Sequence, residues 1–155
     1  MSEKLRYALI GCGRIAPNHI AAAMNNAQDM ELCAVCDPVP EHMETVLAPV
    51  EEGARAKVRR YTEYREMLAA EKPQLCAVAT ESGKHASIGL DALRAGANVI
   101  IEKPLALSLS DARALIQEAD ARNVKLCACH QNRFNKSIQK IRTAVEEGRF
   151  GRMLH

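Results

Sequence analysis

Three features along the chain have residue types and spacing that suit the binding of a nucleotide. The first is a turn that reads Gly11-Cys-Gly13-Arg-Ile-Ala16, which is the pattern G-x-G-x-x-A. In this pattern the first glycine allows a tight turn, the second lets the backbone approach a pyrophosphate, and the small third residue lets a helix pack closely on a strand. A helix that starts here offers free N–H groups and the positive end of its dipole to phosphates.

The second feature is an acid at the distance expected for a contact with a ribose. Asp37 lies 24 residues beyond Gly13 and directly follows the apolar segment 31–36. An acid at about this spacing hydrogen-bonds the adenosine ribose and would repel a 2′-phosphate, and residues 38–42 contain no arginine to receive one. The pattern predicts NAD rather than NADP. The alternatives are a glycine turn in an α/β domain without nucleotide and a methyltransferase-like fold, which the later motifs disfavour.

The third feature is a set of polar residues that follow apolar segments. Ligands of open parallel sheets bind beyond the carboxyl ends of the strands. Lys103, in Glu102-Lys103-Pro104, could there hydrogen-bond a substrate hydroxyl and stabilise a developing alkoxide. The loop from Thr80 to His85 would face the same crevice. The alternatives are a surface lysine before a loop proline and a histidine that caps a helix or lies on the surface.

A fourth polar segment, His130-Gln-Asn-Arg-Phe-Asn-Lys136, follows the last predicted strand. Arg133 and Lys136 could clamp an anionic group, and Asn132 and Gln131 could donate to hydroxyls. The alternative is an ordinary polar connection.

The six cysteines point to no metal or redox site. Cys33 and Cys36 have the spacing C-x-x-C, but on a strand an offset of three places the two side chains on opposite faces. Cys127 and Cys129 share a face. We interpret these four as small apolar residues buried in core strands.

The apolar periodicity predicts strands that alternate with helices, which is typical of a parallel sheet covered on both faces. Thr62 and Ser108, the latter with Asp111, are expected to cap helices. Six strands fit the doubly wound Rossmann order 3-2-1-4-5-6, and residues 153–155 could open another strand. The strands are expected at residues 5–10, 31–36, 58–61, 75–79, 98–102 and 125–129, and the helices at 15–26, 40–47, after 62, at 85–95, after 108 and at 137–147.

Composition limits the function further. The chain of 155 residues has a formal net charge of +2 and 3% aromatic residues, which predicts one globular domain and no nucleic-acid partner. Its apolar runs are too short to span a membrane, and its first residues lack a signal-peptide pattern. We therefore expect a cytoplasmic protein.

Taken together, GCGRIAPNHI, Asp37, the EKPLALS segment and the HQNRF segment resemble the Gfo/Idh/MocA family of oxidoreductases over essentially the whole chain. The resemblance implies a Rossmann domain for residues 1–150, with 151–155 starting a substrate domain that is absent. It also implies NAD-dependent hydride transfer to or from a hydroxyl group of a sugar or related compound, and homo-oligomers in the full-length protein. The branch that looks most similar comprises dehydrogenases acting at C3 of UDP-N-acetylglucosamine or its uronic acid.

The resemblance also implies roles for individual residues. Lys103 matches the catalytic or substrate-orienting lysine. The predicted cofactor-binding residues are Gly11, Gly13, Arg14, Ile15, Asp37, Thr80, Ser82, His85, Glu102 and Lys103, and the predicted substrate-binding residues are Asn132, Arg133 and Lys136. Two hypotheses follow: a dehydrogenase of a sugar or nucleotide sugar, or a truncated NAD-binding module without independent catalytic activity.

Overall fold

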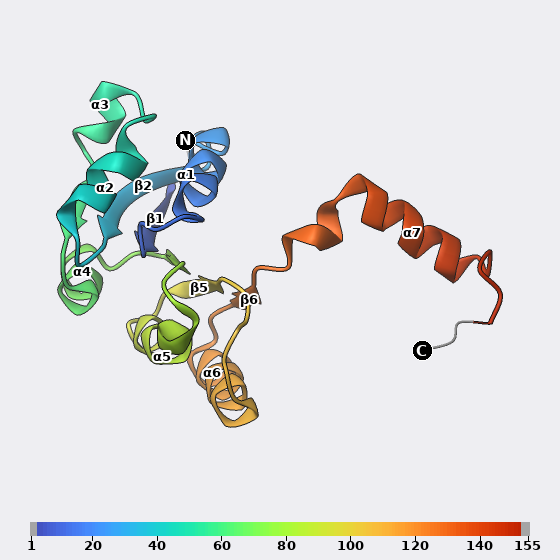
Figure 1. The fold of residues 1–155 in the computed structure, drawn as a ribbon. Coiled ribbons are helices and arrows are strands. Elements are labelled where there is room, and N and C mark those ends of the chain that lie inside the picture. Colours follow the sequence, from blue (N-terminus) through green and yellow to red (C-terminus); the bar gives the residue numbers. More distant parts are fainter. Residues whose placement is uncertain (1–2, 153–155) are drawn as a thin grey trace.

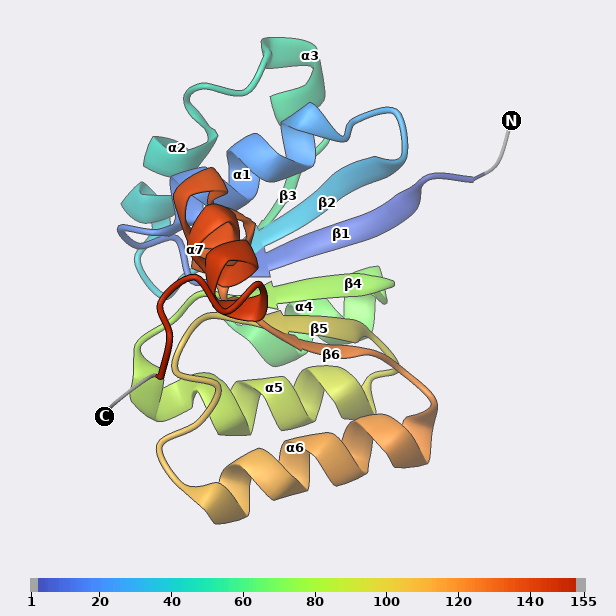
Figure 2. The same ribbon diagram turned by 90° about the vertical axis from the view of Figure 1, so that its right-hand side faces the viewer.

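The structure, a computed structural model, describes residues 3–152 and contains in that range a six-stranded parallel sheet (Figures 1 and 2). The order β3-β2-β1-β4-β5-β6 confirms the predicted doubly wound α/β fold. The possible strand at residues 153–155 lies outside the described residues. The strands are β1 (Leu5–Ile10), β2 (Met30–Cys36), β3 (Arg59–Tyr61), β4 (Leu75–Val78), β5 (Asn98–Ile101) and β6 (Leu126–Ala128).

Helices cover the two faces of the sheet in separate groups. The helices are α1 (Ala16–Asn25), α2 (Pro40–Leu47), α3 (Glu52–Arg55), α4 (Tyr64–Glu71), α5 (His85–Arg94), α6 (Leu109–Arg122) and α7 (Lys136–Glu146), with 3-10 turns η1 (Ser82–Lys84) and η2 (Gln131–Phe134). Buried residues of α1 and α2 pack on one face, and those of α4, α5 and α6 pack on the other. This division follows from right-handed crossovers on either side of β1, the central switch point.

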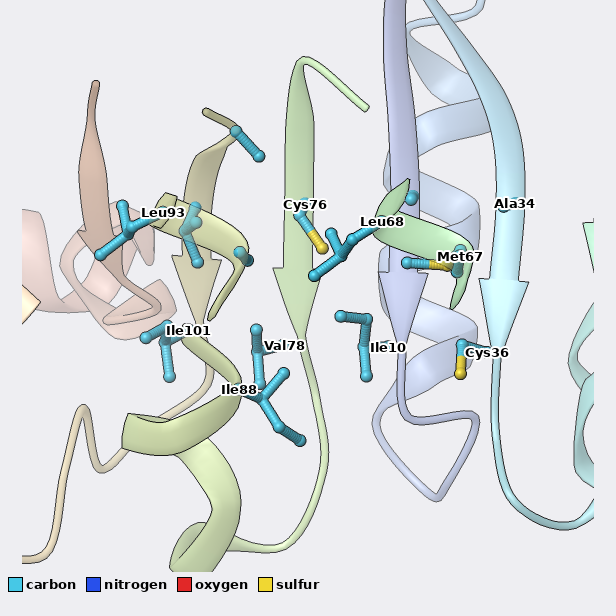
Figure 3. Packing of buried hydrophobic residues seen from close by; sticks show 14 of the residues in the cluster. Ile10, Ala34, Cys36, Met67, Leu68, Cys76, Val78, Ile88, Leu93 and Ile101 are labelled. Carbon is cyan, nitrogen blue, oxygen red and sulfur yellow. The ribbon is translucent and has the colours of Figure 1, made fainter. Parts of the chain in front are cut away.

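The core on the α4–α6 face is formed by aliphatic and sulfur-containing side chains (Figure 3). Val78, Ile101 and Leu93 are fully buried, and Ile88 packs among them. Gly89 on α5 faces Ile101 so closely that a Cβ atom would lie 2.6 Å from the Ile101 Cδ1 atom. The absence of a side chain at residue 89 therefore allows α5 to approach the sheet.

A bulge in β2 corrects the expected orientation of the C-x-x-C pair. Leu32 pairs with Tyr7 and Ala34 pairs with Ala8, which leaves Cys33 as an extra residue. Such a bulge breaks the alternation of side chains along a strand. Cys33 and Cys36 consequently belong to the same buried cluster, whereas the sequence predicted opposite faces.

The helix starts test two predicted caps. The Ser108 hydroxyl accepts a hydrogen bond from the Asp111 N–H at 3.0 Å, which confirms the cap of α6. The predicted Thr62 cap is wrong, because α4 starts one residue later and Glu63 occupies the N-cap position without a side-chain bond. The polar stretch before β3 also contains a helix that was not predicted, α3, whose first N–H groups are bound by the Glu51 carboxylate.

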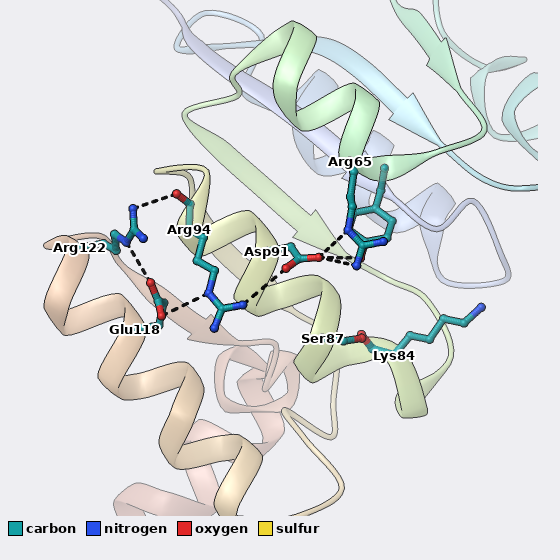
Figure 4. A network of polar contacts seen from close by, with 8 residues as sticks. Arg65, Lys84, Ser87, Asp91, Arg94, Glu118 and Arg122 are labelled. Atoms are coloured by element: carbon teal, nitrogen blue, oxygen red, sulfur yellow. Dashed lines mark hydrogen bonds and ion pairs between the residues drawn. The ribbon is translucent and has the colours of Figure 1, made fainter.

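A polar network ties the helices of one face together (Figure 4). Asp91 on α5 accepts hydrogen bonds from the Tyr64 hydroxyl at 2.8 Å and from the Arg65 Nε atom at 3.0 Å, both on α4. Arg94, one turn further along α5, lies 3.5 Å from the carboxylate of Glu118 on α6. These contacts link the three helices that support the loops after β4 and β5.

The last strand and helix are the least covered part of the described chain. Cys127 in β6 is exposed and Cys129 is half-buried, so the prediction that both are buried in the core is wrong. Figure 1 shows α7 extending away from the layered part of the molecule, and its apolar side chains Ile138, Ile141 and Val145 are exposed. No helix in residues 3–152 is long and apolar enough to cross a membrane.

Candidate cofactor-binding site

A cavity of about 870 Å³ opens at the carboxyl ends of β1, β2, β4 and β5. A volume of this size is typical of a site for a small molecule or cofactor. The sequence placed ten residues at the cofactor, and the structure brings all of them to the lining of this one cavity. They are Gly11, Gly13, Arg14, Ile15, Asp37, Thr80, Ser82, His85, Glu102 and Lys103.

The two glycines of the first turn serve different purposes. Gly11 has φ +93°, and a Cβ atom there would lie 2.6 Å from the Ala79 carbonyl oxygen, so the turn requires glycine for both its conformation and its space. Gly13 has no atom within 4 Å of its would-be Cβ position and lines the cavity. This open space before the N-terminus of α1 is where a pyrophosphate would approach the backbone.

Asp37 is a buried carboxylate that the surrounding backbone holds in place. Its Oδ2 atom accepts a hydrogen bond from the Cys12 N–H at 2.8 Å, and its Oδ1 atom accepts one from the Val39 N–H at 2.9 Å. The His42 Nδ1 atom lies 3.0 Å from the same Oδ1 atom. Burial, and then the charge of Asp37, raise the pKa of the Cys12 thiol to about 12. The carboxylate is thus fixed between the glycine turn and the start of α2.

His85 lines the cavity but uses both ring nitrogens within the protein. Nδ1 lies 2.7 Å from the Pro104 carbonyl oxygen and Nε2 lies 3.0 Å from the Thr80 carbonyl oxygen. Both partners are acceptors, so the ring donates to both only when it carries a proton on each nitrogen. At 1% exposure His85 is not a surface residue, and it joins the loop after β4 to the loop after β5.

Glu102 and Lys103 directly follow β5 and differ in their exposure to solvent. Glu102 is buried, and its Oε1 atom lies 3.0 Å from the Nε2 atom of His19 on α1. Lys103 is exposed and lines the cavity. The Cys129 thiol also borders Glu102, and burial followed by this contact raises its pKa to about 11. Glu102 therefore connects α1 to the segment that carries Lys103.

The predicted substrate residues lie apart from the cavity lining. Asn132, Arg133 and Lys136 occupy η2 and the first turn of α7 and are exposed, whereas their neighbour Gln131 does line the cavity. Sequence reasoning missed His19, although it lies in the quoted segment GCGRIAPNHI. Its partner is 83 residues away, and only the folded sheet brings the two together.

The geometry at the strand ends agrees with a comparison with known protein families. The model of the GFO_IDH_MocA family, described as "Oxidoreductase family, NAD-binding Rossmann fold", matches residues 5–130. The chain belongs to the Gfo/Idh/MocA family. The resemblance drawn from the sequence is thereby confirmed, and the residues matched include the glycine turn, Asp37 and Lys103.

Several known dehydrogenases are similar to this chain. D-apiose dehydrogenase of Paraburkholderia graminis is 31% identical over 150 residues, covering 96% of this chain and 38% of that protein. D-glucoside 3-dehydrogenase of Escherichia coli is 32% identical and is matched over 41% of its length. The structure of the WlbA dehydrogenase from Bordetella pertussis, in complex with NADH and UDP-GlcNAcA, has a TM-score of 0.85 and 34% identity, covering 97% of this chain and 44% of that one. The chain thus spans about two fifths of the length of these relatives.

Proposed function

We propose that the chain binds NAD in preference to NADP and forms the cofactor-binding part of a dehydrogenase that acts on a hydroxyl group of a sugar or nucleotide sugar. The observation that carries this proposal is the lining of a single cavity by all ten predicted residues, which come from loops far apart in the sequence. NAD supplies the chemistry of hydride transfer when it is bound. The residues of this chain supply position and charge.

Two parts of the cavity suit the binding of a dinucleotide. The open space at Gly13 and the N-terminus of α1 would receive the pyrophosphate. Asp37, with one acceptor position left on Oδ2, would accept a hydrogen bond from the adenosine ribose. The negative charge of Asp37 is the reason to expect NAD rather than NADP.

Lys103 is the residue that we place at the reacting hydroxyl group. It is exposed to the cavity, and a lysine ammonium can hydrogen-bond a hydroxyl and stabilise negative charge as its proton leaves. The carboxylate of the preceding residue, the buried Glu102, accepts a hydrogen bond from the backbone N–H of Lys103 at 3.3 Å. Asn132, Arg133 and Lys136 follow β6 on the same side of the sheet, and we propose them as contacts for the sugar and its diphosphate.

The remaining proposals concern the protein as a whole. Residues 1–150 would form the NAD-binding domain and 151–155 the start of a substrate domain, with homo-oligomers in the full-length protein. The similarity to WlbA supports a nucleotide sugar as the substrate class. The thiols of all six cysteines are free, which suits the reducing cytoplasm. A cofactor-binding module without turnover is the second candidate, which the position of Asn132, Arg133 and Lys136 outside the cavity lining favours.

Titration calorimetry with NAD and NADP tests the cofactor proposal. We expect NAD to bind at least about tenfold more tightly, a difference of about 1.4 kcal/mol. Asp37→Asn removes the charge but replaces one of the two oxygens that accept the Cys12 and Val39 N–H groups with an NH2 donor. The readout is therefore the ratio of the NAD and NADP affinities, which should narrow, because a disturbance of the fold alone would weaken the binding of both cofactors alike. Glu41→Ala, which removes an exposed carboxylate four residues away, should change neither affinity. Equal affinities for the two cofactors in the wild type would overturn the proposal.

Turnover separates the two candidate functions. The chain is mixed with NAD and a panel of UDP-sugars, and the formation of NADH is followed by its absorbance. NADH formation favours a catalytically competent dehydrogenase. Binding of NAD without NADH formation favours the module.

A further inference from the structure

His42 stands beside the carboxylate that we expect to meet the ribose. It lies in the first turn of α2, and its Nδ1 atom is 3.0 Å from the Asp37 Oδ1 atom. An ionised carboxylate only accepts hydrogen bonds, so Nδ1 carries the proton of this contact. The side chain is 52% exposed and lines the cavity. The other ring nitrogen of His42, Nε2, has no hydrogen-bond partner among residues 3–152.

The acceptor positions of Asp37 are nearly all occupied. A carboxylate offers about four lone-pair positions. Val39 and His42 use two of them on Oδ1, and Cys12 uses one on Oδ2. One position remains for a ribose hydroxyl. The imidazole of His42 therefore borders the place where NAD carries a 2′-hydroxyl and NADP carries a 2′-phosphate.

The charge of this imidazole changes what the site offers to a phosphate. In the neutral ring Nε2 is a bare acceptor, so both it and the Asp37 carboxylate repel a phosphate group. In the protonated ring Nε2 becomes a donor, and the positive charge offsets that of Asp37. Hydrogen bonds between charged partners are roughly twice as strong as neutral ones.

We propose that His42 determines how strongly the site discriminates against NADP, with the discrimination greatest when the ring is neutral and reduced when the ring is protonated. This inference rests on the proposed binding of NAD at Asp37. It adds a specificity-determining residue that the glycine motif and the ribose-binding acid do not include.

Other charged groups near His42 influence the affinity for both cofactors but should not change that affinity between about pH 6 and about pH 8. Arg14 and Glu63 line the same cavity, and Glu41 and Glu44 flank His42 on α2, with Glu44 paired to Arg60 at 2.8 Å. Carboxylates and guanidinium groups ordinarily titrate well outside the interval from about pH 6 to about pH 8. The 2′-phosphate of NADP gains a proton near about pH 6, so a variant without the imidazole must be measured in parallel.

The test is calorimetric titration of the wild-type chain with NAD and NADP at about pH 6 and about pH 8, with His42→Gln and His42→Arg. From the higher to the lower pH, the ratio of the NADP and NAD dissociation constants should fall by about fivefold more in the wild type than in His42→Gln, equivalent to about 1 kcal/mol. His42→Arg, a permanent cation, should bind NADP more tightly than the wild type at the higher pH. His130→Gln, which alters a histidine outside the cavity lining, should behave as the wild type.

The outcomes separate the inference from the function on which it rests. The same pH trend in His42→Gln and the wild type, with NAD still bound, would overturn the role of His42 and leave the proposed function intact. A wild-type chain that binds no NAD would overturn both. Thermal melting of each variant verifies that the exposed substitution has left the fold intact.

Discussion

The two glycines of the first turn should respond to the same substitution in opposite ways. Gly11→Ala places a methyl group 2.6 Å from the Ala79 carbonyl oxygen and 2.8 Å from the Thr80 backbone nitrogen, at a φ of +93°. Gly13→Ala places the same methyl group in open space on the cavity wall. The first change should damage the fold, and the second should damage only the binding of NAD.

The size of each effect follows from these surroundings. For Gly11→Ala, a side chain in a sparsely populated backbone conformation costs about 1–3 kcal/mol. The clash is with backbone atoms of the β4 end, which cannot rotate away, and overpacking of this kind adds about 1–3 kcal/mol. We expect a loss of about 4 kcal/mol in the free energy of unfolding. For a chain of this size that corresponds to a fall in Tm of about 8–16 °C.

For Gly13→Ala we expect a change in stability within about 0.5 kcal/mol, because the new methyl group meets no atom. Its effect should appear in the titration with NAD, as a loss of affinity of at least about tenfold, because the methyl group occupies the approach of the pyrophosphate.

Urea denaturation followed by circular dichroism measures the stability of both variants, and calorimetric titration measures their binding of NAD. Unchanged stability of Gly11→Ala would refute the argument from the close approach of β1 and β4. Wild-type affinity of Gly13→Ala for NAD would refute the assignment of the open space to the pyrophosphate.

Three further predictions test how the site is supported. His85→Ala should lower the free energy of unfolding by about 2–3 kcal/mol in urea denaturation, because the fully buried ring and its hydrogen bonding to the loops after β4 and β5 are lost. A loss below about 0.5 kcal/mol would contradict this. A thiol reagent at about pH 8 should label the exposed Cys127 first. Cys76 should react only on unfolding, because it is buried and its burial raises the pKa of its thiol. Peptide mass spectrometry identifies the labelled cysteine, and early labelling of Cys76 would contradict the packing. Asp91→Ala should lower the free energy of unfolding by about 1 kcal/mol, because the hydrogen bonds from Tyr64 and Arg65 to this carboxylate are lost. An unchanged urea midpoint would contradict this.

The fold was predictable from the sequence because the spacing of apolar residues, and the glycines and prolines that end helices and strands, act on nearby residues of the chain. The strand Leu5–Ile10 and the helix Pro40–Leu47 have the predicted bounds. The bulge at Cys33 was not predictable, because it depends on how β2 pairs with β1 rather than on the residues of β2 alone. The exposure of Cys127 was also not predicted, although the predicted strand order already puts β6 at an edge of the sheet, because an apolar segment does not reveal how much of an edge strand its neighbours cover.

The candidate site also has features that the sequence predicts and features that only the folded structure reveals. The residues that line the cavity were predictable, because parallel strands bring all their carboxyl ends to one edge of the sheet. Their partners were not predictable, because His19 and Glu102 are joined only by the fold. His42 lies five residues from Asp37, but whether its ring turns toward the carboxylate depends on the direction of α2.

The polar groups of this site have structural duties as well as proposed functional ones. Asp37 binds the N–H of the glycine turn, Glu102 binds His19 of α1, and His85 joins two loops. Removing any of these side chains would leave buried partners unsatisfied, so a loss of NAD binding in such a variant would not separate a contact with the cofactor from a disturbed fold.

The positions that avoid this ambiguity are exposed ones with at most one polar contact within the protein. Gly13 faces open space, and Lys103 is exposed at the cavity. His42 is half exposed and contacts the protein through one ring nitrogen. Substitutions at these three positions therefore report on the pyrophosphate, the reacting hydroxyl group and the 2′-position of the ribose separately, which makes them the most direct probes of the proposed function.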